Sequence, residues 1–308
     1  MSATTLTLAH SPDADDAFMW WPITGKIDAG TGERIAAPVL DTGGLRFEAV
    51  AADIQALNER AMSRGDLDIT AISMHALSHV SDRYALTRCG ASMGEGYGPK
   101  VVARAGAGPA EMIRAVRSGG ARVAAPGRQT TALLVFSLMI GAAPPRVNAM
   151  SFERVIESVV SGESDVGLVI HDGQLTFADA GLTEVADLGA WWGSHTSGLP
   201  LPLGANAVRR DLDERCGDGA TEEVAGLLER SIAYSMENWE ESIEYAATFA
   251  PGGATREKIE RFVRMYVNEL TRDMGERGVE AVRRLLGEGA AAGLCPRAAL
   301  QVVGASGG

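Results

Sequence analysis

The pattern of hydrophobic and polar positions changes its period several times along the chain, and these changes predict a mixed α/β fold. Residues 5–9 alternate and include β-branched side chains, which is typical of a strand, and a helix is expected from about Ala14. Apolar residues at helical spacing predict a helix over 52–64, and a short apolar run predicts a buried strand over 67–72. The same criteria predict helices over 111–118, 130–140, 152–160, 222–238, 240–249, 256–270 and 278–287, and strands over 122–125 and 166–170.

One short unit occurs twice. It runs from a helix end through a glycine, an acidic residue, any residue and an aspartate into an apolar strand, and it is found at Gly65-Asp66-Leu67-Asp68 and at Gly162-Glu163-Ser164-Asp165. A polar residue stands where each strand ends, Ser73 in the first unit and His171 in the second. Because alternating strands and helices pair as parallel α/β units, two copies predict two similar α/β lobes.

Two extended segments bounded by glycine and proline, 98–104 and 198–204, are expected to carry the chain between these lobes. The predicted large lobe is then discontinuous, formed by 1–103 and 205–308, and the small lobe is 104–204. A ligand is expected in the cleft between them, at the carboxyl ends of the strands. Two crossings suit hinge closure. Residues 24–44, which hold five glycines and a proline, are expected to form an inserted loop or hairpin.

Composition mainly excludes classes of protein. Among 308 residues, Lys and Arg number 28 against 40 Asp and Glu, and the net charge of -12 disfavours nucleic-acid binding. A small anionic ligand stays compatible, because local amides and one arginine outweigh distant charge. No apolar run approaches the length of a membrane span. Residues 1–9 lack the basic start and apolar core of a secretory signal, and Cys89, Cys216 and Cys295 are widely spaced. We therefore expect free thiols and a cytoplasmic protein; the sequence does not indicate the oligomeric state.

His171 is the strongest candidate for chemistry. It directly follows the predicted strand 166–170, and Asp172-Gly173 then turns the chain, so the imidazole is expected at the carboxyl end of the strand, facing the cleft. A neutral imidazole in that position accepts a proton near neutral pH. The alternative is a histidine that caps a loop through hydrogen bonds.

A second candidate is the junction 126–132 between a strand and an apolar helix. Unpaired backbone N–H groups and the hydroxyls of Thr130 and Thr131 at a helix start suit a carboxylate or phosphate, and Arg128 adds positive charge. The alternative is an ordinary threonine N-cap beside a surface arginine.

Metal binding is weighed at two clusters and predicted at neither. Asp13, Asp15 and Asp16 have ligand chemistry for Mg²⁺, but such acids more often cap a helix. His75 and His79 have the spacing of a zinc pair without the glutamate of H-E-x-x-H or an evident third ligand. No nucleotide-binding glycine motif and no G-x-S-x-G is present. We expect neither metal nor cofactor.

Taken together, several motifs resemble the 1,4-dihydroxy-6-naphthoate synthase family of the futalosine route to menaquinone. The resemblance covers about residues 5–300. It rests on these segments: Gly98-Pro-Lys-Val-Val-Ala-Arg104, Pro126-Gly-Arg-Gln-Thr-Thr-Ala132, Ile170-His-Asp-Gly-Gln-Leu-Thr-Phe177, Asp187-Leu-Gly-Ala-Trp-Trp192, Gly198-Leu-Pro-Leu-Pro-Leu-Gly204 and Tyr266-Val-Asn268 with Thr271, Asp273 and Gly275.

The resemblance implies a two-lobe fold like that of the type II periplasmic binding proteins, with a ligand cleft between the lobes. It also implies a cofactor-free carbon–carbon lyase acting on an aromatic carboxylate-bearing small molecule: cyclic dehypoxanthine futalosine becomes 1,4-dihydroxy-6-naphthoate. By the same resemblance His171 is the catalytic base. The residues expected to hold substrate or shape its loop are Ser11, Asp16, Ala71, Ser73, Arg128, Thr130 and Thr131.

The chain departs from the family pattern at the expected site. Its first loop reads Ser11-Pro-Asp-Ala-Asp-Asp-Ala-Phe18 where the family usually has Ser-Pro-Cys-Pro-Asn-Asp-Thr-Phe, and Ala71 stands where the family has lysine. An aspartate at 15 and the loss of a lysine are expected to make the pocket less welcoming to a carboxylate. Two alternatives therefore stay open: a solute-binding protein of a transporter, and a divergent relative such as a chorismate dehydratase.

Overall fold

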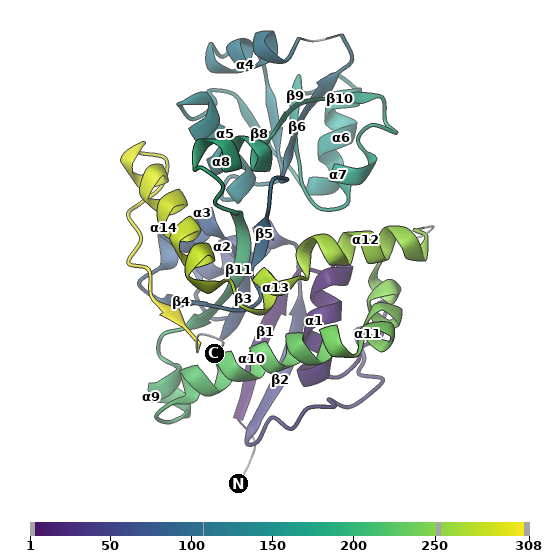
Figure 1. Ribbon diagram of the computed structural model, residues 1–308, viewed down its shortest axis with the longest axis vertical. Helices are drawn as coiled ribbons and strands as arrows, with labels where there is room; N and C mark the ends of the chain where they lie inside the picture. Colours follow the sequence, from purple (N-terminus) through teal and green to yellow (C-terminus); the bar gives the residue numbers. More distant parts are fainter. Residues whose placement is uncertain (1–3, 107, 251–253, 305–308) are drawn as a thin grey trace.

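Two β-sheets with helices packed on their faces form two lobes, stacked along the long axis of the molecule (Figure 1). The computed structural model describes residues 4–106, 108–250 and 254–304. The predicted α/β class is confirmed. Cys89, Cys216 and Cys295 are free, as expected. Within the described residues, no helix combines the length and the apolar character needed to cross a bilayer.

The larger sheet has seven strands in the order β12-β4-β11-β3-β1-β2, with β5 paired to β11. Its strands are β1 (Thr4–His10), β2 (Leu45–Ala51), β3 (Ile69–Ser73), β4 (Tyr84–Thr87), β5 (Ser92–Gly94), β11 (Leu201–Arg209) and β12 (Val302–Val303). The pairing of β1 with β3 is parallel, as predicted for the α/β units, and β1 also pairs in parallel with β2 on its other side. In contrast, β11 is antiparallel to β3, because the chain enters β11 from the other lobe, at the edge where β3 ends.

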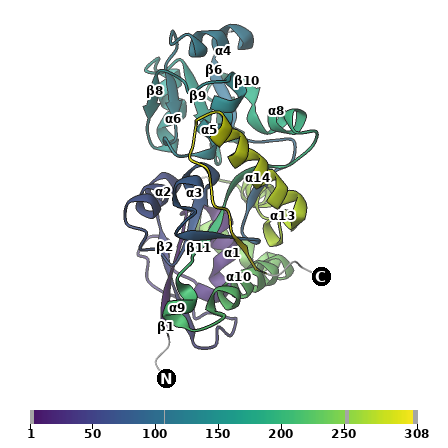
Figure 2. The ribbon, with the colours of Figure 1, turned by 90° about the vertical axis from the view of Figure 1, so that its left-hand side faces the viewer.

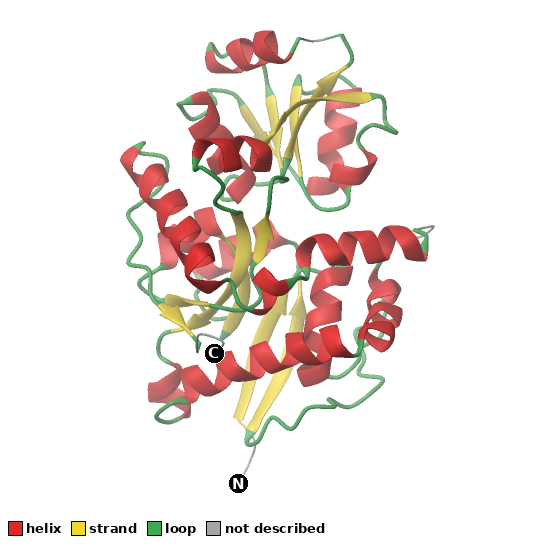
Figure 3. Cartoon of the chain, in the orientation of Figure 1, coloured by secondary structure: helices red, strands yellow, loops and turns green. Residues whose placement is uncertain are grey.

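Helices cover this sheet (Figure 3), and they come from both the N-terminal and the C-terminal parts of the chain. They are α1 (Ala14–Thr24), α2 (Ile54–Ser63), α3 (Met74–Val80), α9 (Leu212–Cys216), α10 (Ala220–Glu237), α11 (Trp239–Ala246), α12 (Arg256–Tyr266), α13 (Glu269–Arg272) and α14 (Gly275–Ala291), with a 3₁₀ turn at Ala247–Phe249. Every residue of α1 is buried, because α10, α11 and α12 pack around it. The C-terminal helices thereby fix the first loop, which leads into α1.

The smaller sheet has five strands in the order β10-β6-β9-β7-β8. Its elements are β6 (Lys100–Arg104), α4 (Pro109–Arg117), β7 (Val123–Ala125), α5 (Thr131–Ile140), β8 (Val147–Ala149), α6 (Phe152–Val160), β9 (Val166–Val169), α7 (Gly173–Thr176), β10 (Leu182–Asp187) and α8 (Leu188–His195). The side view shows α14 lying alongside α5 of this lobe (Figure 2).

The two segments expected to link the lobes are largely strands. Residues 100–104 are β6 of the smaller sheet, and residues 201–204 begin β11 of the larger one. The chain therefore passes between the sheets at 95–99 and 196–200, which overlap only the first residues of the two expected segments. The division into 1–103 with 205–308 and 104–204 stays a prediction.

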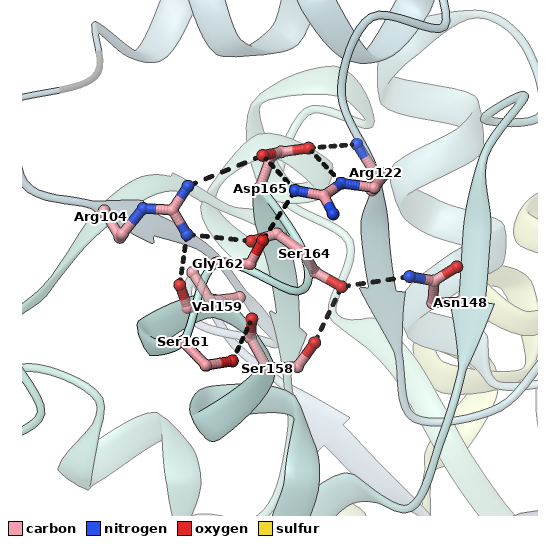
Figure 4. Close-up of polar contacts among 9 residues, drawn as sticks. All are labelled: Arg104, Arg122, Asn148, Ser158, Val159, Ser161, Gly162, Ser164 and Asp165. Carbon is pink, nitrogen blue, oxygen red and sulfur yellow. Dashed lines mark hydrogen bonds and ion pairs between the residues drawn. The ribbon is translucent and has the colours of Figure 1, made fainter.

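The repeated Gly-acid-x-Asp unit occurs once in each sheet, before β3 and before β9. Asp165 accepts hydrogen bonds from the backbone N–H and the guanidinium of Arg122, at the start of β7 (Figure 4). Asp68 likewise accepts from the backbone N–H and the hydroxyl of Thr7 in β1. Each aspartate thus joins its strand to the neighbouring parallel strand. The repeated unit therefore helps to fix how neighbouring parallel strands are aligned in each sheet.

Residues between α1 and β2 form the predicted loop, with one isolated antiparallel bridge between Ile27 and Arg34. The loop lies against α11, where the backbone N–H of Ile27 donates to the Tyr245 hydroxyl and Lys26 pairs with Glu241 at 2.9 Å. None of its residues lines the cleft between the lobes.

Candidate active site

A cleft between the lobes, with about 800 Å³ of space including its mouth, is lined by residues from both sheets. Seven of the eight predicted site residues line it: Ser11, Asp16, Ala71, Ser73, Thr130, Thr131 and His171. They come from the carboxyl ends of β1, β3 and β9, from the first turn of α1 and from the start of α5. The predicted position of the ligand site, outside the carboxyl ends of parallel strands, fits this arrangement.

His171 has a strained backbone conformation and lies just after β9, where the smaller lobe borders the cleft. Its φ of 52° is in the left-handed region, which is uncommon for a residue with a side chain and recurs at functional sites. The ring packs against Phe152 with 4.6 Å between centroids. Its Nδ1 lies 2.8 Å from Oδ2 of Asp13, and each of these side chains keeps about one-fifth of its surface exposed.

This contact sets the charge of both groups. Burial lowers the pKa of His171, but the Asp13 carboxylate more than offsets it and raises that pKa to about 9. Burial opposes the charge of Asp13 too, and His171 nevertheless holds the Asp13 pKa below its ordinary value. The pair is therefore ionised at neutral pH. The sequence predicted a histidine that titrates near neutrality, and the structure moves that titration upward.

The first loop shapes this pair. The Ser11 hydroxyl donates to Asp13 Oδ2 at 2.8 Å, and the backbone N–H of Ser11 donates to Asp16 Oδ2 at 3.0 Å. The Trp20 indole N–H donates to the other Asp16 oxygen at 3.0 Å. Ser11 and Asp16 therefore hold the loop, and Asp13 projects from it towards His171.

Asp15 is the carboxyl of this turn that has a buried oxygen without a hydrogen-bond partner. Its side chain lines the cleft, the residue is 9% exposed, and its buried Oδ1 has no partner. Burial raises the Asp15 pKa well above the ordinary value, and the nearby charges of Asp16 and Asp13 raise it further.

Ser73 is oriented by a residue that the sequence did not single out. The fully buried Asn58 donates from Nδ2 to the Ser73 hydroxyl oxygen at 3.0 Å and accepts from the Ser73 backbone N–H at 3.0 Å. A hydroxyl that already accepts this hydrogen bond keeps its own proton for donation. Asn58 thereby prepares Ser73 as a donor at the wall of the cleft.

At the start of α5 the two threonine hydroxyls are already engaged. Thr131 accepts from the backbone N–H of Met74 at 2.9 Å and donates to the Leu203 carbonyl, and Thr130 donates to the Gly127 carbonyl at 3.0 Å. The backbone N–H groups of the first turn lack partners within the helix and are the donors available to an anion.

Arg128 does not join the cleft. It is exposed, and its guanidinium donates to the Val147 carbonyl at 3.3 Å. The interpretation of Arg128 as a surface arginine, left open by the sequence, describes its position. Among the described residues that line the cleft there is no lysine or arginine, so the positive charge there comes from His171 alone.

Sequence reasoning also missed polar residues on other elements of the cleft. Gln174 of α7 donates to the hydroxyl of Tyr266 in α12, so this hydrogen bond joins the two lobes. The buried Oδ1 of Asn206, in β11, lacks a partner and lies in the cleft wall. Gln174 and Tyr266 fall within the motifs that carry the family resemblance, which was the available signal.

Of the two clusters weighed for metal binding, the aspartates of the first loop line the cleft and the histidine pair does not. His75 and His79 face each other with 5.5 Å between ring centroids and do not line the cleft, and burial lowers the pKa of His75 to about 4. Over residues 4–106, 108–250 and 254–304, no three His, Cys, Asp or Glu side chains are grouped to hold a metal ion.

This two-lobe fold with a ligand cleft is that of the periplasmic binding proteins. The alkanesulfonate-binding protein SsuA of Xanthomonas axonopodis pv. citri superposes with a TM-score of 0.67 at 12% identity, over 99% of this chain and all of that chain. At that identity the likeness concerns the fold alone.

The chain itself belongs to the menaquinone biosynthesis family, whose sequence model matches residues 6–291. It is 38% identical to the 1,4-dihydroxy-6-naphthoate synthase of Thermus thermophilus over 290 residues, covering 94% of this chain and 95% of that protein. It is 36% identical to the synthase of the same name from Streptomyces coelicolor, over 96% of both chains. The structure of AF1704 from Archaeoglobus fulgidus matches with a TM-score of 0.78 at 39% identity, over 94% of this chain and 98% of that one. The two synthases are enzymes, and this chain is an enzyme of their family.

Proposed function

We propose that this protein is a carbon–carbon lyase that converts cyclic dehypoxanthine futalosine to 1,4-dihydroxy-6-naphthoate, with His171 as general base. The observation that carries the proposal is the ion pair between His171 and Asp13 inside the cleft of a family member. A perturbed histidine paired with a carboxylate in a cleft is typical of a catalytic base.

The pair assigns a role to each ring nitrogen. Nδ1 donates its hydrogen to Asp13, so Nε2 is the atom that takes the substrate proton. Asp13 stabilises the imidazolium that then forms. A raised pKa makes His171 a stronger base but leaves about 1% of it neutral at pH 7, since the pKa is about 9. Proton transfer in this cleft therefore gains from mildly alkaline conditions.

The substrate carboxylate is held without a lysine or arginine in our proposal. The first-turn amides of α5 and the Ser73 hydroxyl supply donors from the two lobes, and the hydrogen bond from the Met74 N–H to the Thr131 hydroxyl keeps these two segments next to each other. Backbone amides at a helix start attract negative charge, including the charge that develops on a substrate after proton removal.

The test is product analysis. The purified protein is mixed with cyclic dehypoxanthine futalosine, and 1,4-dihydroxy-6-naphthoate is followed by chromatography and mass spectrometry. His171→Ala should lower the rate by roughly 10²–10⁴ while product affinity stays within about tenfold. His195→Ala is the matched control, because His195 pairs with Glu288 away from the cleft.

Three outcomes contradict the proposal or a part of it. Binding of the compound with no conversion favours the solute-binding alternative, and turnover of chorismate in its place favours the dehydratase alternative. Full activity of the His171 variant contradicts the assignment of the base.

A further inference from the structure

Three carboxyl groups of one turn line the cleft, and two of them are fully committed. Asp13 pairs with His171 and accepts from Ser11, and both oxygens of Asp16 accept N–H donors, from Ser11 and Trp20. Asp15 lies between them, more than nine-tenths buried, with an Oδ1 that has no partner. Because Asp15 lines the cleft, a bound ligand is the group that can reach this carboxyl.

A third carboxylate at this place is electrostatically unfavourable. The negative charges of Asp16 and Asp13 face it, the cation of His171 is already paired with Asp13, and Tyr266 on α12 is the other titratable group close to it. The charge of His171 and the backbone N–H of Asp15 itself favour the ionised form, but they are weaker than burial and the charges of Asp16 and Asp13. Burial of a carboxylate whose charge is not offset costs more than binding a proton. Two like charges in one site keep one group neutral for the same reason.

We propose that Asp15 is a neutral carboxylic acid in the cleft and that its hydroxyl donates a hydrogen bond to an acceptor oxygen of the bound substrate. The partner is a carboxylate, carbonyl or developing oxyanion oxygen. This proposal rests on the proposed function, because it assigns Asp15 to the substrate of that cleft. The raised pKa of Asp15 agrees with the geometry.

The proposal changes the expectation drawn from the sequence. An aspartate at position 15 was expected to make the pocket less welcoming to a carboxylate, but a protonated aspartate has a hydrogen-bond donor beside its carbonyl acceptor, as an amide also has. The cleft, which has no lysine or arginine among its described lining residues, is then spared another negative charge. Asp15 becomes a determinant of binding for oxygen-rich anions.

Infrared spectroscopy of the protein without ligand tests the protonation independently of any activity. The wild-type minus Asp15→Asn difference spectrum at pH 7 should contain the C=O band of a protonated carboxylic acid. The band should convert to carboxylate bands as pH rises. A difference spectrum at pH 7 with carboxylate bands alone overturns the proposal whether or not the protein is a lyase.

Binding of 1,4-dihydroxy-6-naphthoate, measured by calorimetry, tests the donor role. Asp15→Asn should keep affinity within about threefold, because its amide still donates, whereas Asp15→Ala should lose about tenfold or more. Thermal unfolding of both variants checks that they fold. Equal losses in the two variants indicate an ionised carboxylate and overturn the proposal.

The pH dependence of this binding separates Asp15 from His171. Wild-type affinity should fall as Asp15 loses its proton, and the Asp15→Asn variant should retain only the fall that accompanies titration of His171 near pH 9. If the infrared band is present but neither substitution changes affinity, the donor role is wrong. If neither protein binds the compound while the band is present, the proposed function fails along with the donor role, whereas the protonation stands.

Discussion

Oδ2 of Asp13 and Nδ1 of His171 lie 2.8 Å apart, although Asp13 belongs to the larger lobe and His171 follows β9 of the smaller one. A second contact between the lobes is the hydrogen bond from Gln174 in the smaller lobe to Tyr266 in the larger one. A rotation that opens the lobes separates Asp13 from His171 and returns the pKa of His171 towards its ordinary value. Closure and the strength of the base are therefore linked.

The first prediction concerns Asp13. Asp13→Asn should lower kcat by roughly 10²-fold or more at alkaline pH, because the imidazolium formed during the reaction loses its counter-charge. It should also move the pKa of His171 down from about 9 towards 6.5. The measurement is the pH profile of kcat in both proteins. Asp172→Asn is the control, since Asp172 adjoins His171 in sequence but does not line the cleft. An unchanged profile in the Asp13 variant would mean that Asp13 does not tune the base.

The second prediction is the pH dependence of the wild-type enzyme. The base must be neutral to accept a proton, and a raised pKa keeps it protonated to higher pH. The value of kcat/KM should therefore rise about tenfold per pH unit below pH 8 and level off near pH 9. An ordinary histidine would reach its plateau above about pH 6.5. A plateau already complete at pH 7 would contradict the ionised pair.

The third prediction concerns Ser73. Ser73→Ala should weaken binding of 1,4-dihydroxy-6-naphthoate about tenfold, because the cleft loses the donor that Asn58 orients. It should also destabilise the fold by about 1 kcal/mol, since Asn58 loses an acceptor.

Ser78→Ala is its matched control. Ser78 is buried in α3, the helix that begins directly after Ser73; it donates to the His75 carbonyl at 2.6 Å and does not line the cleft. Its loss should cost similar stability and leave affinity unchanged. If both variants bind equally well, Ser73 does not contact the ligand.

The elements that the sequence predicted are those whose signals are local. The helix and strand of each repeated unit, the first strand and the position of His171 after an apolar strand depend on spacing over a few residues, and the structure has them. β2 (Leu45–Ala51) was missed, because only the first four of its seven residues follow the buried-exposed alternation and it lies at the sheet edge.

The missed features of the site are non-local. Asp13 was weighed as a helix cap or metal ligand, because only the packing of one lobe against the other brings it to His171. Arg128 was placed in the cleft from its neighbours in sequence, but its side chain turns to Val147. The engagement of Thr131 with Met74 and Leu203 likewise depends on segments far away along the chain.

The last prediction concerns stability and the repeated unit. Asp165→Asn should destabilise the protein by about 1–3 kcal/mol at pH 7, because Asp165 accepts charge-assisted hydrogen bonds from both the guanidinium and the backbone N–H of Arg122. The hydrogen bond from the Arg122 side chain is the main cause that lowers the pKa of Asp165 to about 2. Stability gained from a lowered carboxyl pKa is complete above the unfolded value of 3.8 and is lost as pH falls through about 2. The difference between wild type and variant in urea unfolding should therefore shrink from pH 5 to pH 3.

Glu163→Gln, in the same turn, is the control: its pair with Arg154 is exposed and 3.6 Å long, so its loss should change stability by less than about 0.5 kcal/mol. Equal effects of the two substitutions would show that Asp165 does not hold β9 to β7.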